Sequence, residues 1–390
     1  ADGRNITLST PEQLADDLGF SPEARPDFLR TFARVIEVCE ALARPPVEKL
    51  VRELLGISGV EWLGPVDDEV LLYYRRLVST EIGFSLDTDS AFSMLTGMPA
   101  FGGASEVWGG FLVPEGGAPM IGRAMADRLR RKPVTGAVVT SVVPGGGRVR
   151  IAYRHDGQHK IVDAGHVVMA TPHPVTAQLV HGLPSTQLLA MDAIRVLPVV
   201  EVQVLLADGG PAPWDDLSAM WTMDKSFSIA VHSKTDLANR IGTGGSDKHS
   251  VVKLLAVGPS ALPLADLGDE YVVQTFIDDL MDVFPAAQGR VLDHSVRRWT
   301  HGVPLPTLGY EQRVADLVRP LGTIHFAGDW CGFVDTNNLG GLGLDGDWGG
   351  YTVTAALHTV MRAGIRLPPR SGPISPDARS RAISTSSQKR

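Results

Sequence analysis

Apolar side chains recur at helical spacing through the first hundred residues. One stripe repeats every three or four positions and consists of Phe28, Phe32, Val35, Ile36 and Cys39. Further amphipathic segments lie at 46–56 and 68–82, and Thr10-Pro11-Glu12-Gln13 predicts a helix start in which Gln13 reaches back to the cap. Residues 1–98 are therefore predicted to be mostly helical, with Cys39 as a core residue.

A different pattern starts near residue 99, where glycines become dense. Pro119 opens a predicted helix whose apolar face comprises Ile121, Ala124, Met125 and Leu129. Valine-rich and alternating runs then predict strands at 138–143 and 148–153. Asp156-Gly157 predicts the tight turn of a hairpin, after which the chain pairs back.

The rest of the chain mixes strands with single helices. A short strand at 166–170 runs into Thr171-Pro172, which predicts a cap and a following helix. Later strands are expected at 199–206, within 218–232, and at 250–257, 291–299 and 323–327. Helices are expected at 269–284 and around 353–360, with a loop at 233–249.

Bulk composition limits the function without naming it. A chain of 390 residues exceeds the ~250–300 over which one hydrophobic core keeps growing, so two domains are expected. The net charge of −8 argues against a nucleic-acid binder. Two cysteines allow no disulfide framework, and no apolar run reaches the ~18 residues needed to span a bilayer. The sequence therefore predicts a cytoplasmic protein without a transmembrane segment or a nucleic-acid partner.

The most informative motif runs from Ile324 to Asp329. A short buried strand ends there in small residues followed by a carboxylate. Glycine at position 328 lets the backbone approach a ligand closely, and a carboxylate accepts hydrogen bonds from ligand hydroxyls, such as those of a ribityl chain. A strand followed by an ordinary Asx turn has the same letters, so the motif alone leaves both interpretations open.

A glycine-rich loop at 340–350 leads into the last predicted helix. Peptide N–H groups at a helix start favour an anion or an electron-rich ring edge. Gly341, Gly343 and Gly346 have the GxGxxG spacing of a dinucleotide fingerprint. No strand runs directly into them and little chain follows, so we reject that interpretation.

Five segments, in this order, resemble the superfamily of flavin-containing amine oxidases and phytoene desaturases. They are Pro114–Gly117 before a helix, the valine strand at 138–143, Val167–Pro172, Arg298-Trp299 with Pro304 and Pro306, and Phe326–Asp329 with its glycine-rich sequel. The resemblance covers roughly residues 100–362. It implies an α/β fold, that of a two-domain FAD-dependent oxidoreductase.

The resemblance also implies roles for single residues. Val139 matches a strand position whose backbone holds the adenine, and Asp329 matches the acidic residue at the ribityl or pyrophosphate region. The implied FAD-binding positions are Val139, Trp299, Gly328, Asp329, Gly343, Leu344, Asp345 and Gly346. Trp299 matches a tryptophan near the flavin, although the same letter fits a core aromatic. Substrate contacts are expected from Tyr310, Trp221 and Phe227.

The sequence departs from this family in three respects. The strand–GxGxxG–helix unit that binds the ADP half of FAD is not found, so a separate N-terminal FAD-binding chain is the expected partner. The lysine that assists oxygen reaction in many amine oxidases aligns with Glu201. The family's amine cage has two aromatic walls. Gly343 stands at the position of one of them, and Tyr310 is expected to form the other. These departures favour a bulky apolar substrate over a small amine.

Other chemistries lack a matching pattern. The histidines show no HExxH spacing, and no Gly-x-Ser-x-Gly elbow occurs. Asp345 and Asp347 are two carboxylates, which alone do not make a metal site. No metal is therefore expected, and the sequence identifies no catalytic residue.

The sequence thus predicts an FAD-dependent enzyme that removes hydride from a C–H next to nitrogen or carbon. Its α/β fold lacks the family's N-terminal βαβ dinucleotide-binding unit. The expected parts are a helical part of the substrate domain (1–98), an FAD-domain segment (99–170), a substrate domain (171–287), a C-terminal FAD-domain segment (288–362) and a disordered tail (363–390). The alternatives are a polyene or terpenoid desaturase and a non-catalytic partner subunit.

Overall fold

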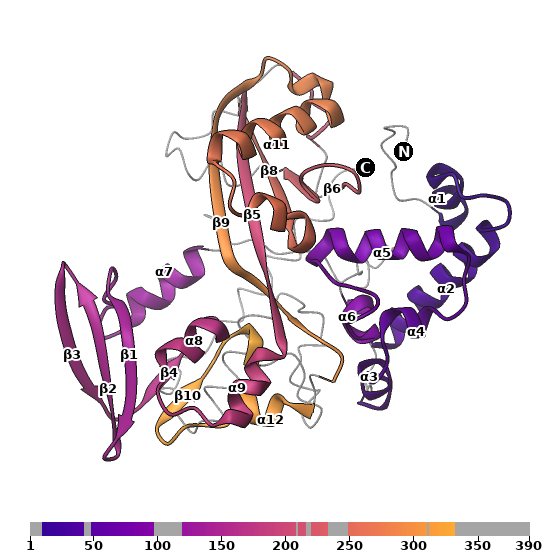
Figure 1. Ribbon diagram of the computed structural model, residues 1–390. Helices are drawn as coiled ribbons and strands as arrows, with labels where there is room; N and C mark the ends of the chain where they lie inside the picture. The colour runs from indigo at the N-terminus through magenta and orange to yellow at the C-terminus, as the bar shows by residue number, and fades with distance from the viewer. Residues whose placement is uncertain are drawn as a thin grey trace, which may run out of the picture.

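The computed structural model describes the greater part of the chain. The described residues are 10–42, 48–96, 119–207, 210–215, 220–232, 249–309 and 312–331. Their elements form three groups: a helical group, a five-stranded sheet with one long helix, and a smaller α/β group (Figure 1). None of the described helices is both long enough and apolar enough to cross a bilayer.

The helical group confirms the helical pattern of the first hundred residues. Its members are α1 (Pro11–Leu18), α2 (Arg25–Leu42), α3 (Glu48–Leu55), α4 (Gly59–Leu63), α5 (Asp68–Ile82) and α6 (Ala91–Thr96). Cys39 is buried in their shared core, as expected. Thr10 caps α1 by accepting from the Gln13 N–H at 3.2 Å. The Gln13 side chain donates to Asp17 one turn later, so the prediction that it reaches back was wrong.

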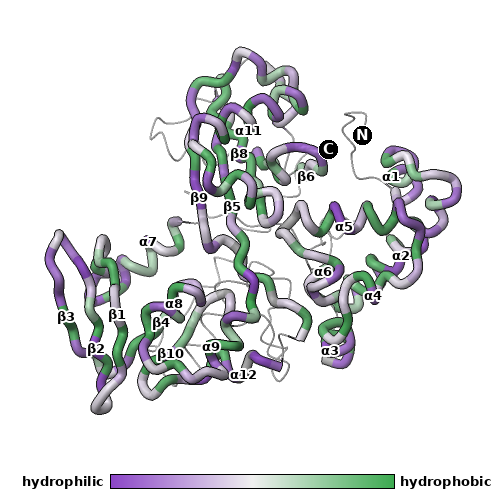
Figure 2. Tube along the Cα trace, viewed as in Figure 1, coloured by the Kyte–Doolittle hydropathy of each residue, from purple (hydrophilic) through white to green (hydrophobic). Residues whose placement is uncertain are grey.

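The five-stranded sheet is the centre of the molecule. Its strand order is β6-β7-β8-β5-β9, with β6 (Met220–Trp221), β7 (Ile229–His232), β8 (His249–Val257), β5 (Ile194–Ala207) and β9 (Val291–Pro306). Figure 2 shows β5 mainly hydrophobic along its length and the upper part of β9 more hydrophilic. Strands β5 and β9 extend well beyond their predicted limits, because Ile194 to Leu197 of β5 pair with Pro306 to Val303 of β9.

One face of this sheet packs on the long helix α11 (Asp269–Val283). The core on that side combines Val200, Val202 and Val204 of β5 with Phe276 and Leu280 of the helix. Short 3₁₀ turns precede and follow α11 in the chain, namely η2 (Gly258–Ser260), η3 (Leu262–Leu264) and η4 (Pro285–Ala287). Alternate residues of β5 therefore face away from α11.

The helical group meets the opposite side of the sheet at the start of β5. Leu197 and Leu305 belong to the core of the helical group. A Cβ at Gly83 would lie 2.9 Å from the Cα of Gly258, so the end of α5 and the η2 turn touch backbone to backbone. Only glycine permits such an approach.

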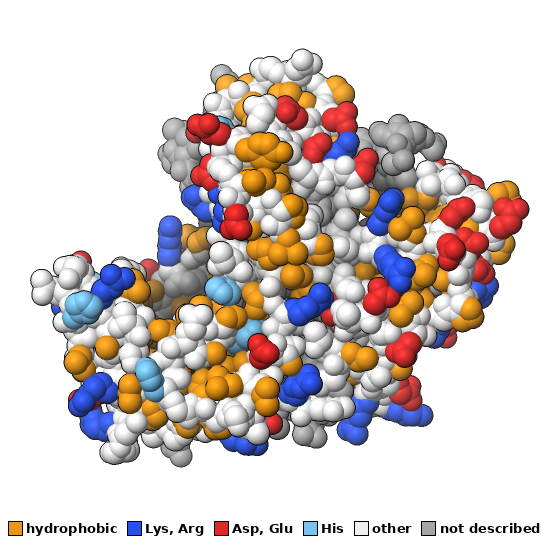
Figure 3. All heavy atoms as spheres, in the orientation of Figure 1, with side chains coloured by type: hydrophobic (Ala, Val, Ile, Leu, Met, Phe, Trp, Pro, Cys, Tyr) orange, Lys and Arg blue, Asp and Glu red, His pale blue; other side chains and the backbone are white. Residues whose placement is uncertain are grey.

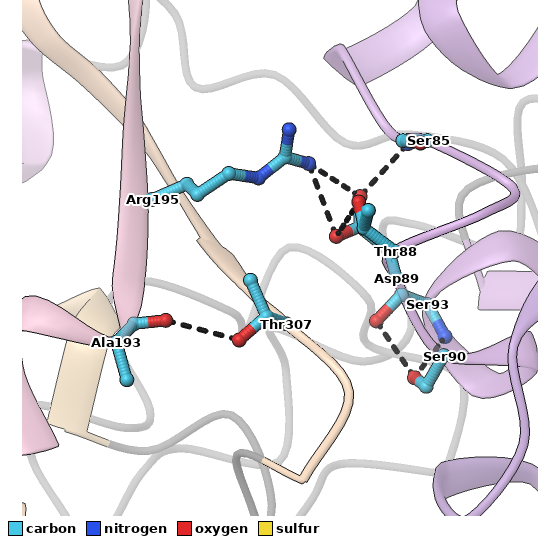
Figure 4. A network of polar contacts seen from close by, with 8 residues as sticks. All are labelled: Ser85, Thr88, Asp89, Ser90, Ser93, Ala193, Arg195 and Thr307. Carbon is cyan, nitrogen blue, oxygen red and sulfur yellow. Dashed lines mark hydrogen bonds and ion pairs between the residues drawn. The ribbon is translucent and has the colours of Figure 1, made fainter.

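An ion pair with a buried carboxylate and a partly exposed arginine crosses this junction (Figure 4). Arg195 donates from Nη2 to both carboxylate oxygens of Asp89, at 3.0 and 2.7 Å. The Ser85 N–H donates to the same carboxylate at 2.8 Å. Burial raises the pKa of Asp89 above its ordinary value, despite the opposing effects of Ser85 and Arg195. Desolvation of the carboxylate thus outweighs its partners.

The smaller α/β group contains two separate sheets. Strands β1 (Val138–Gly145), β2 (Arg148–His155) and β3 (Gln158–Ala164) form an antiparallel meander. Asp156 and Gly157 both have positive φ, 52° and 72°, which confirms the predicted hairpin turn. Strands β4 (Val167–Met169) and β10 (Ile324–Phe326) form a parallel pair.

Four short helices and one turn complete this group. They are α7 (Pro119–Arg128), α8 (His173–Leu179), α9 (Ser185–Asp192), α12 (Val314–Leu317) and η6 (Asp329–Cys331). The N-cap of α8 is Pro172 and makes no side-chain cap, whereas the Thr171 hydroxyl lies 2.7 Å from that of Thr176. The sequence-based prediction of Thr171 as the cap is therefore corrected by one position.

Candidate functional site

The carboxyl ends of β4 and β10 lie side by side. The register pairs Ile324 with Val167 and Phe326 with Met169, and the Ala327 N–H donates to the Met169 carbonyl at 2.8 Å. Because the strands are parallel, the residues that follow each of them leave the sheet at the same edge. Open α/β sheets bind ligands outside the carboxyl ends of their strands. This edge is therefore the candidate site.

Trp330 joins the two loops at this edge. Its ring is 1% exposed, and its Nε1 donates to the Thr171 carbonyl at 3.0 Å. Gly328 has a φ of +146°, and a Cβ there would lie 2.8 Å from the Trp330 Nε1. The sequence analysis missed Trp330. The available signal was its position directly after the Ala-Gly-Asp that ends the strand.

The local geometry predicts a strict requirement for glycine at position 328. Replacing Gly328 with alanine should lower the free energy of unfolding by more than the about 1–3 kcal/mol typical of a strained backbone position, since the methyl group also meets Trp330. Gly322→Ala is the matched control, because Gly322 has φ +59° but a Cβ there would have nothing within 4 Å. Urea denaturation of both variants measures the difference. Equal losses of unfolding free energy in the two variants would show that Trp330 moves away from the added methyl group without a cost in stability.

Buried histidines pack around the same edge. His173 is 3% exposed and donates from Nε2 to the Ile194 carbonyl at 3.1 Å, and its ring lies 5.9 Å from that of Trp330. Burial lowers the pKa of His173 to about 4. The burial and packing of this ring indicate a structural role for His173.

A pair of histidines, His166 and His325, links the start of β4 to β10. His166 Nδ1 lies 3.2 Å from His325 Nε2, and the two rings are stacked. Burial lowers the pKa of His325, and the neighbouring His166 lowers it further. A neutral His325 is therefore favoured on β10, the strand that leads into the Gly328 loop.

Trp299 lies on the sheet face that turns away from α11. It pairs with Val199 across β5 and β9, and its side chain is 44% exposed. Such exposure excludes the alternative interpretation of Trp299 as a core aromatic. Strand β9 also contacts η6, so this sheet approaches the carboxyl end of β10.

A row of cross-strand neighbours runs over the same face. Glu201 pairs with Arg297 on one side and with Leu255 on the other, and Leu255 pairs in turn with Ile229. Trp221 ends the row as the partner of Ile229. Gln203 donates to the Glu201 carboxylate at 2.5 Å, so this acidic group has Gln203 and Arg297 as polar neighbours and Leu255 as an apolar one.

Phe227 lies elsewhere than the sequence suggested. Its side chain is fully buried, and its ring lies 6.0 Å from that of Phe276 on α11. It belongs to the core on the α11 side of the sheet. We therefore leave Phe227 out of the substrate face.

The remaining predicted positions are only partly described. Val139 is 36% exposed in β1, where it pairs with Tyr153. Asp329 begins η6, but its side chain is outside the described part. The positions outside the described residues are Tyr310, Gly343, Leu344, Asp345 and Gly346, together with the predicted last helix and tail.

The described site suits one part of a large cofactor. Small residues follow both strand ends, and Gly328 has a positive φ that favours glycine, with Trp330 packed directly against its Cα. Within the described ranges, no strand–GxGxxG–helix unit is available for an ADP moiety. No cluster of three or more potential metal ligands occurs there either.

Comparison with known proteins agrees with this geometry. The family model of flavin containing amine oxidoreductases matches residues 59–336. No curated protein sequence matches significantly. Solved structures share the fold at low identity. Putrescine oxidase bound to putrescine has a TM-score of 0.63 at 16% identity, covering 93% of this chain and 77% of its own.

Two further structures show the same similarity. Cyclohexylamine oxidase from Brevibacterium oxydans has a TM-score of 0.59 at 17% identity, covering 89% of this chain and 77% of its own. A putative protoporphyrinogen oxidase from Exiguobacterium has a TM-score of 0.52 at 18% identity, covering 75% of this chain and 63% of its own. Since the family model spans well over half of the sequence, from α4 to beyond η6, the chain belongs to the flavin-containing amine oxidoreductase family.

Proposed function

We propose that the chain forms the substrate-binding and flavin-facing part of an FAD-dependent oxidoreductase. The reaction is removal of hydride from a C–H bond next to nitrogen or carbon. One observation carries the proposal: the Gly328 loop at the parallel strand ends lies near a second, half-open sheet face with Trp299 and Trp221 on it. The contact between β9 and η6 supports a cofactor site next to a substrate face.

The cofactor positions inferred from the sequence belong to this proposal. Gly328 and Asp329 would hold the ribityl region, Val139 the adenine, and Trp299 would lie near the flavin ring. The glycine-rich residues Gly343, Leu344, Asp345 and Gly346 would complete the ring contacts, and Tyr310 would join Trp221 on the substrate side. When bound, FAD supplies the hydride acceptor, and the protein supplies orientation and electrostatics.

The sheet face supports an apolar substrate more than a small amine. Val199, Leu255 and Ile229 lie on the same face as Glu201, whose polar neighbours there are Arg297 and Gln203. Burial of apolar substrate surface there contributes about 25 cal/mol per Å². Glu201 also aligns with the lysine that many amine oxidases use with oxygen. This difference supports slow oxidation of the reduced cofactor by air.

The described residues include no strand–GxGxxG–helix unit for the ADP half of FAD. We propose that a separate N-terminal FAD-binding chain supplies that unit. The sequence-based domain limits at 98, 170, 287 and 362 are kept as part of this proposal.

Anaerobic mixing tests the proposed reaction. The completed complex is mixed with panels of amines, amino acids and polyenes while flavin absorbance is followed. We expect bleaching by a bulky apolar compound and slow recovery of the colour in air. Rapid bleaching by a small amine with fast peroxide release would establish an ordinary amine oxidase instead. Bound FAD that no compound bleaches would favour a non-catalytic subunit.

A variant and a matched control connect this reaction to the sheet face. Trp221→Ala should raise the substrate concentration for half-maximal bleaching roughly tenfold, the equivalent of about 1.4 kcal/mol of lost contact. Leu262→Ala changes a residue that is 56% exposed in η3 and should leave that concentration unchanged. If both variants behave like the original protein, the substrate does not bind on this face.

A further inference from the structure

Strand β9 forms one edge of the five-stranded sheet. Its neighbour in the sheet is β5, and within the described ranges no strand pairs with its other side (Figure 1). An edge strand presents unpaired N–H and C=O groups to which another strand can bind. With 16 residues, β9 is much longer than the about 5–6 residues of a typical strand, so its open edge has room for a further strand.

One segment of this edge has a regular backbone. From Asp293 to Trp299, each residue of β9 pairs with a residue of β5 without a shift in register. A register shift at Leu292 limits the segment at its start, and a second shift follows Trp299. Further along, Pro304 and Pro306 lack the N–H that strand pairing requires. A second strand is therefore expected to bind along the segment from Asp293 to Trp299.

Two opposite charges project from this segment. Asp293 and Arg297 are both exposed, whereas no residue of the neighbouring strand β5 is exposed. The Asp293 carboxylate accepts from the adjacent His294 N–H at 2.8 Å. Arg297 donates from Nη1 to the adjacent Val296 carbonyl at 3.1 Å. Neither side chain forms an ion pair with a residue that the structure describes, so both charges are available to a partner at this edge.

The two charges are placed symmetrically about Ser295. Asp293 lies two residues before it and Arg297 two residues after it, so all three side chains lie on the sheet face away from α11. In an antiparallel pair of two copies with a twofold axis at Ser295, Asp293 of each copy would lie directly opposite Arg297 of the other. Opposite charges across an antiparallel pair stabilise it, and like charges destabilise it. The spacing of these charges therefore favours a second copy of the same strand.

Exposed apolar side chains flank the two charges. Leu292 is 54% exposed where the register shift leaves it without a partner on β5, and Trp299 is 44% exposed at the other end of the segment. A twofold axis at Ser295 brings Leu292 of one copy near Trp299 of the other, at both ends of the contact. Removal of this apolar surface from water would add to the stability of the pair.

Charged residues on an edge strand often prevent such pairing. Charges of one sign do so because a second copy places the same sign opposite. Strand β9 carries both signs, and Figure 3 shows acidic and basic side chains close to each other along this margin of the sheet. On the α11 side, Arg298 already pairs with Asp269, so its charge is compensated within the chain. The charges of β9 therefore select a partner strand of complementary order.

We infer that β9 is a dimerisation edge. Two copies of the chain pair antiparallel about a twofold axis at Ser295, and their two five-stranded sheets become one continuous sheet. The added strand lies in the plane of the sheet, so the face away from α11 stays open to a substrate. The inference therefore does not depend on the proposed flavin chemistry.

Charge reversal tests this arrangement. Light scattering after size exclusion gives the mass of the full chain over a range of concentrations, and we expect a dimer that salt weakens. Asp293→Arg places arginines opposite each other at both ion pairs, and Arg297→Asp places aspartates there. Each variant should weaken the dimer about tenfold or more, because two attractions become two repulsions.

Restored complementarity is the sharper measurement. When the Asp293→Arg and Arg297→Asp chains are mixed in equal amounts, each arginine faces an aspartate, and a heterodimer should form. Asp293→Arg/Arg297→Asp in one chain should likewise dimerise as the original does. Asp278→Arg and Arg52→Asp are the matched controls, at exposed positions on α11 and α3, and should leave the dimer unchanged.

Each outcome supports or overturns the dimerisation edge. Since Asp293 and Arg297 are exposed, the variants should melt at the temperature of the original chain, which excludes misfolding as the cause of a lost dimer. A heterodimer from two monomeric variants would establish the Asp293–Arg297 contact between copies. A monomeric original chain, a dimer that neither single variant weakens, or single variants that stay monomeric when mixed would overturn the inference.

Discussion

Replacing Arg195 with methionine is expected to lower the free energy of unfolding by about 3–5 kcal/mol, the range for breaking a buried ion pair. The Asp89 carboxylate is 2% exposed, and without Arg195 it keeps the Ser85 N–H as its main donor. Asp89→Asn should cost less, because the remaining Arg195 side chain is 38% exposed and reaches water. Urea denaturation followed by tryptophan fluorescence measures both.

The double variant measures the interaction between Asp89 and Arg195 separately from their contacts with other residues. Asp89→Asn/Arg195→Met should be less destabilised than the sum of the single variants, since neither charge is left alone. Arg75→Met is the matched control, because it removes an exposed ion pair with Asp87 and should cost at most about 1 kcal/mol. If Arg195→Met costs no more than Arg75→Met, the Asp89–Arg195 contact does not stabilise the junction between α6 and β5.

Acidification is expected to destabilise the fold through His173. Burial is the main reason that its pKa falls from 6.5 to about 4, with His301 as a smaller contribution. The unfolded chain therefore binds a proton at His173 below pH 6.5, whereas the folded chain does so only near pH 4. The contribution of His173 to the free energy of unfolding is fully present above pH 6.5. It is lost as the pH falls toward 4, by about 3 kcal/mol over this window.

A substitution that cannot titrate tests this assignment. His173→Gln retains a side-chain N–H for the Ile194 carbonyl, so part of the stability at pH 7 should remain. Its free energy of unfolding should change less between pH 7 and pH 4 than that of the original chain. His181→Gln changes an exposed histidine a few residues later and serves as the control. Identical acid profiles for His173→Gln and the original chain would assign the acid loss to other groups.

Local patterns predicted the elements that depend on near neighbours. The segment 68–82 was predicted as a helix and forms α5 over the same residues. Pro119 starts α7, and Asp156-Gly157 makes the hairpin turn between β2 and β3. Each of these depends on capping, on fixed φ or on positive φ, which a few adjacent residues decide.

Other features were missed because they depend on distant partners. Strand β5 starts at Ile194, five residues before its predicted start, because its first part pairs with the outer half of β9. Phe227 was expected to contact substrate, yet it packs on Phe276, and Trp330 was overlooked although it ties β10 to the Thr171 loop. No local sequence pattern predicts such contacts between distant residues.

By itself, the sequence determined the family, the flavin chemistry that the family implies, and the strand–Gly-Asp motif at positions 324–329. These features are carried by short segments whose residue types are constrained by local backbone and ligand chemistry. Only the tertiary structure decided which side chains share a face, that Asp89 meets Arg195 across the junction, and that α7 has an apolar face without a described partner. The physical reason is that burial and pairing are set by residues far apart along the chain.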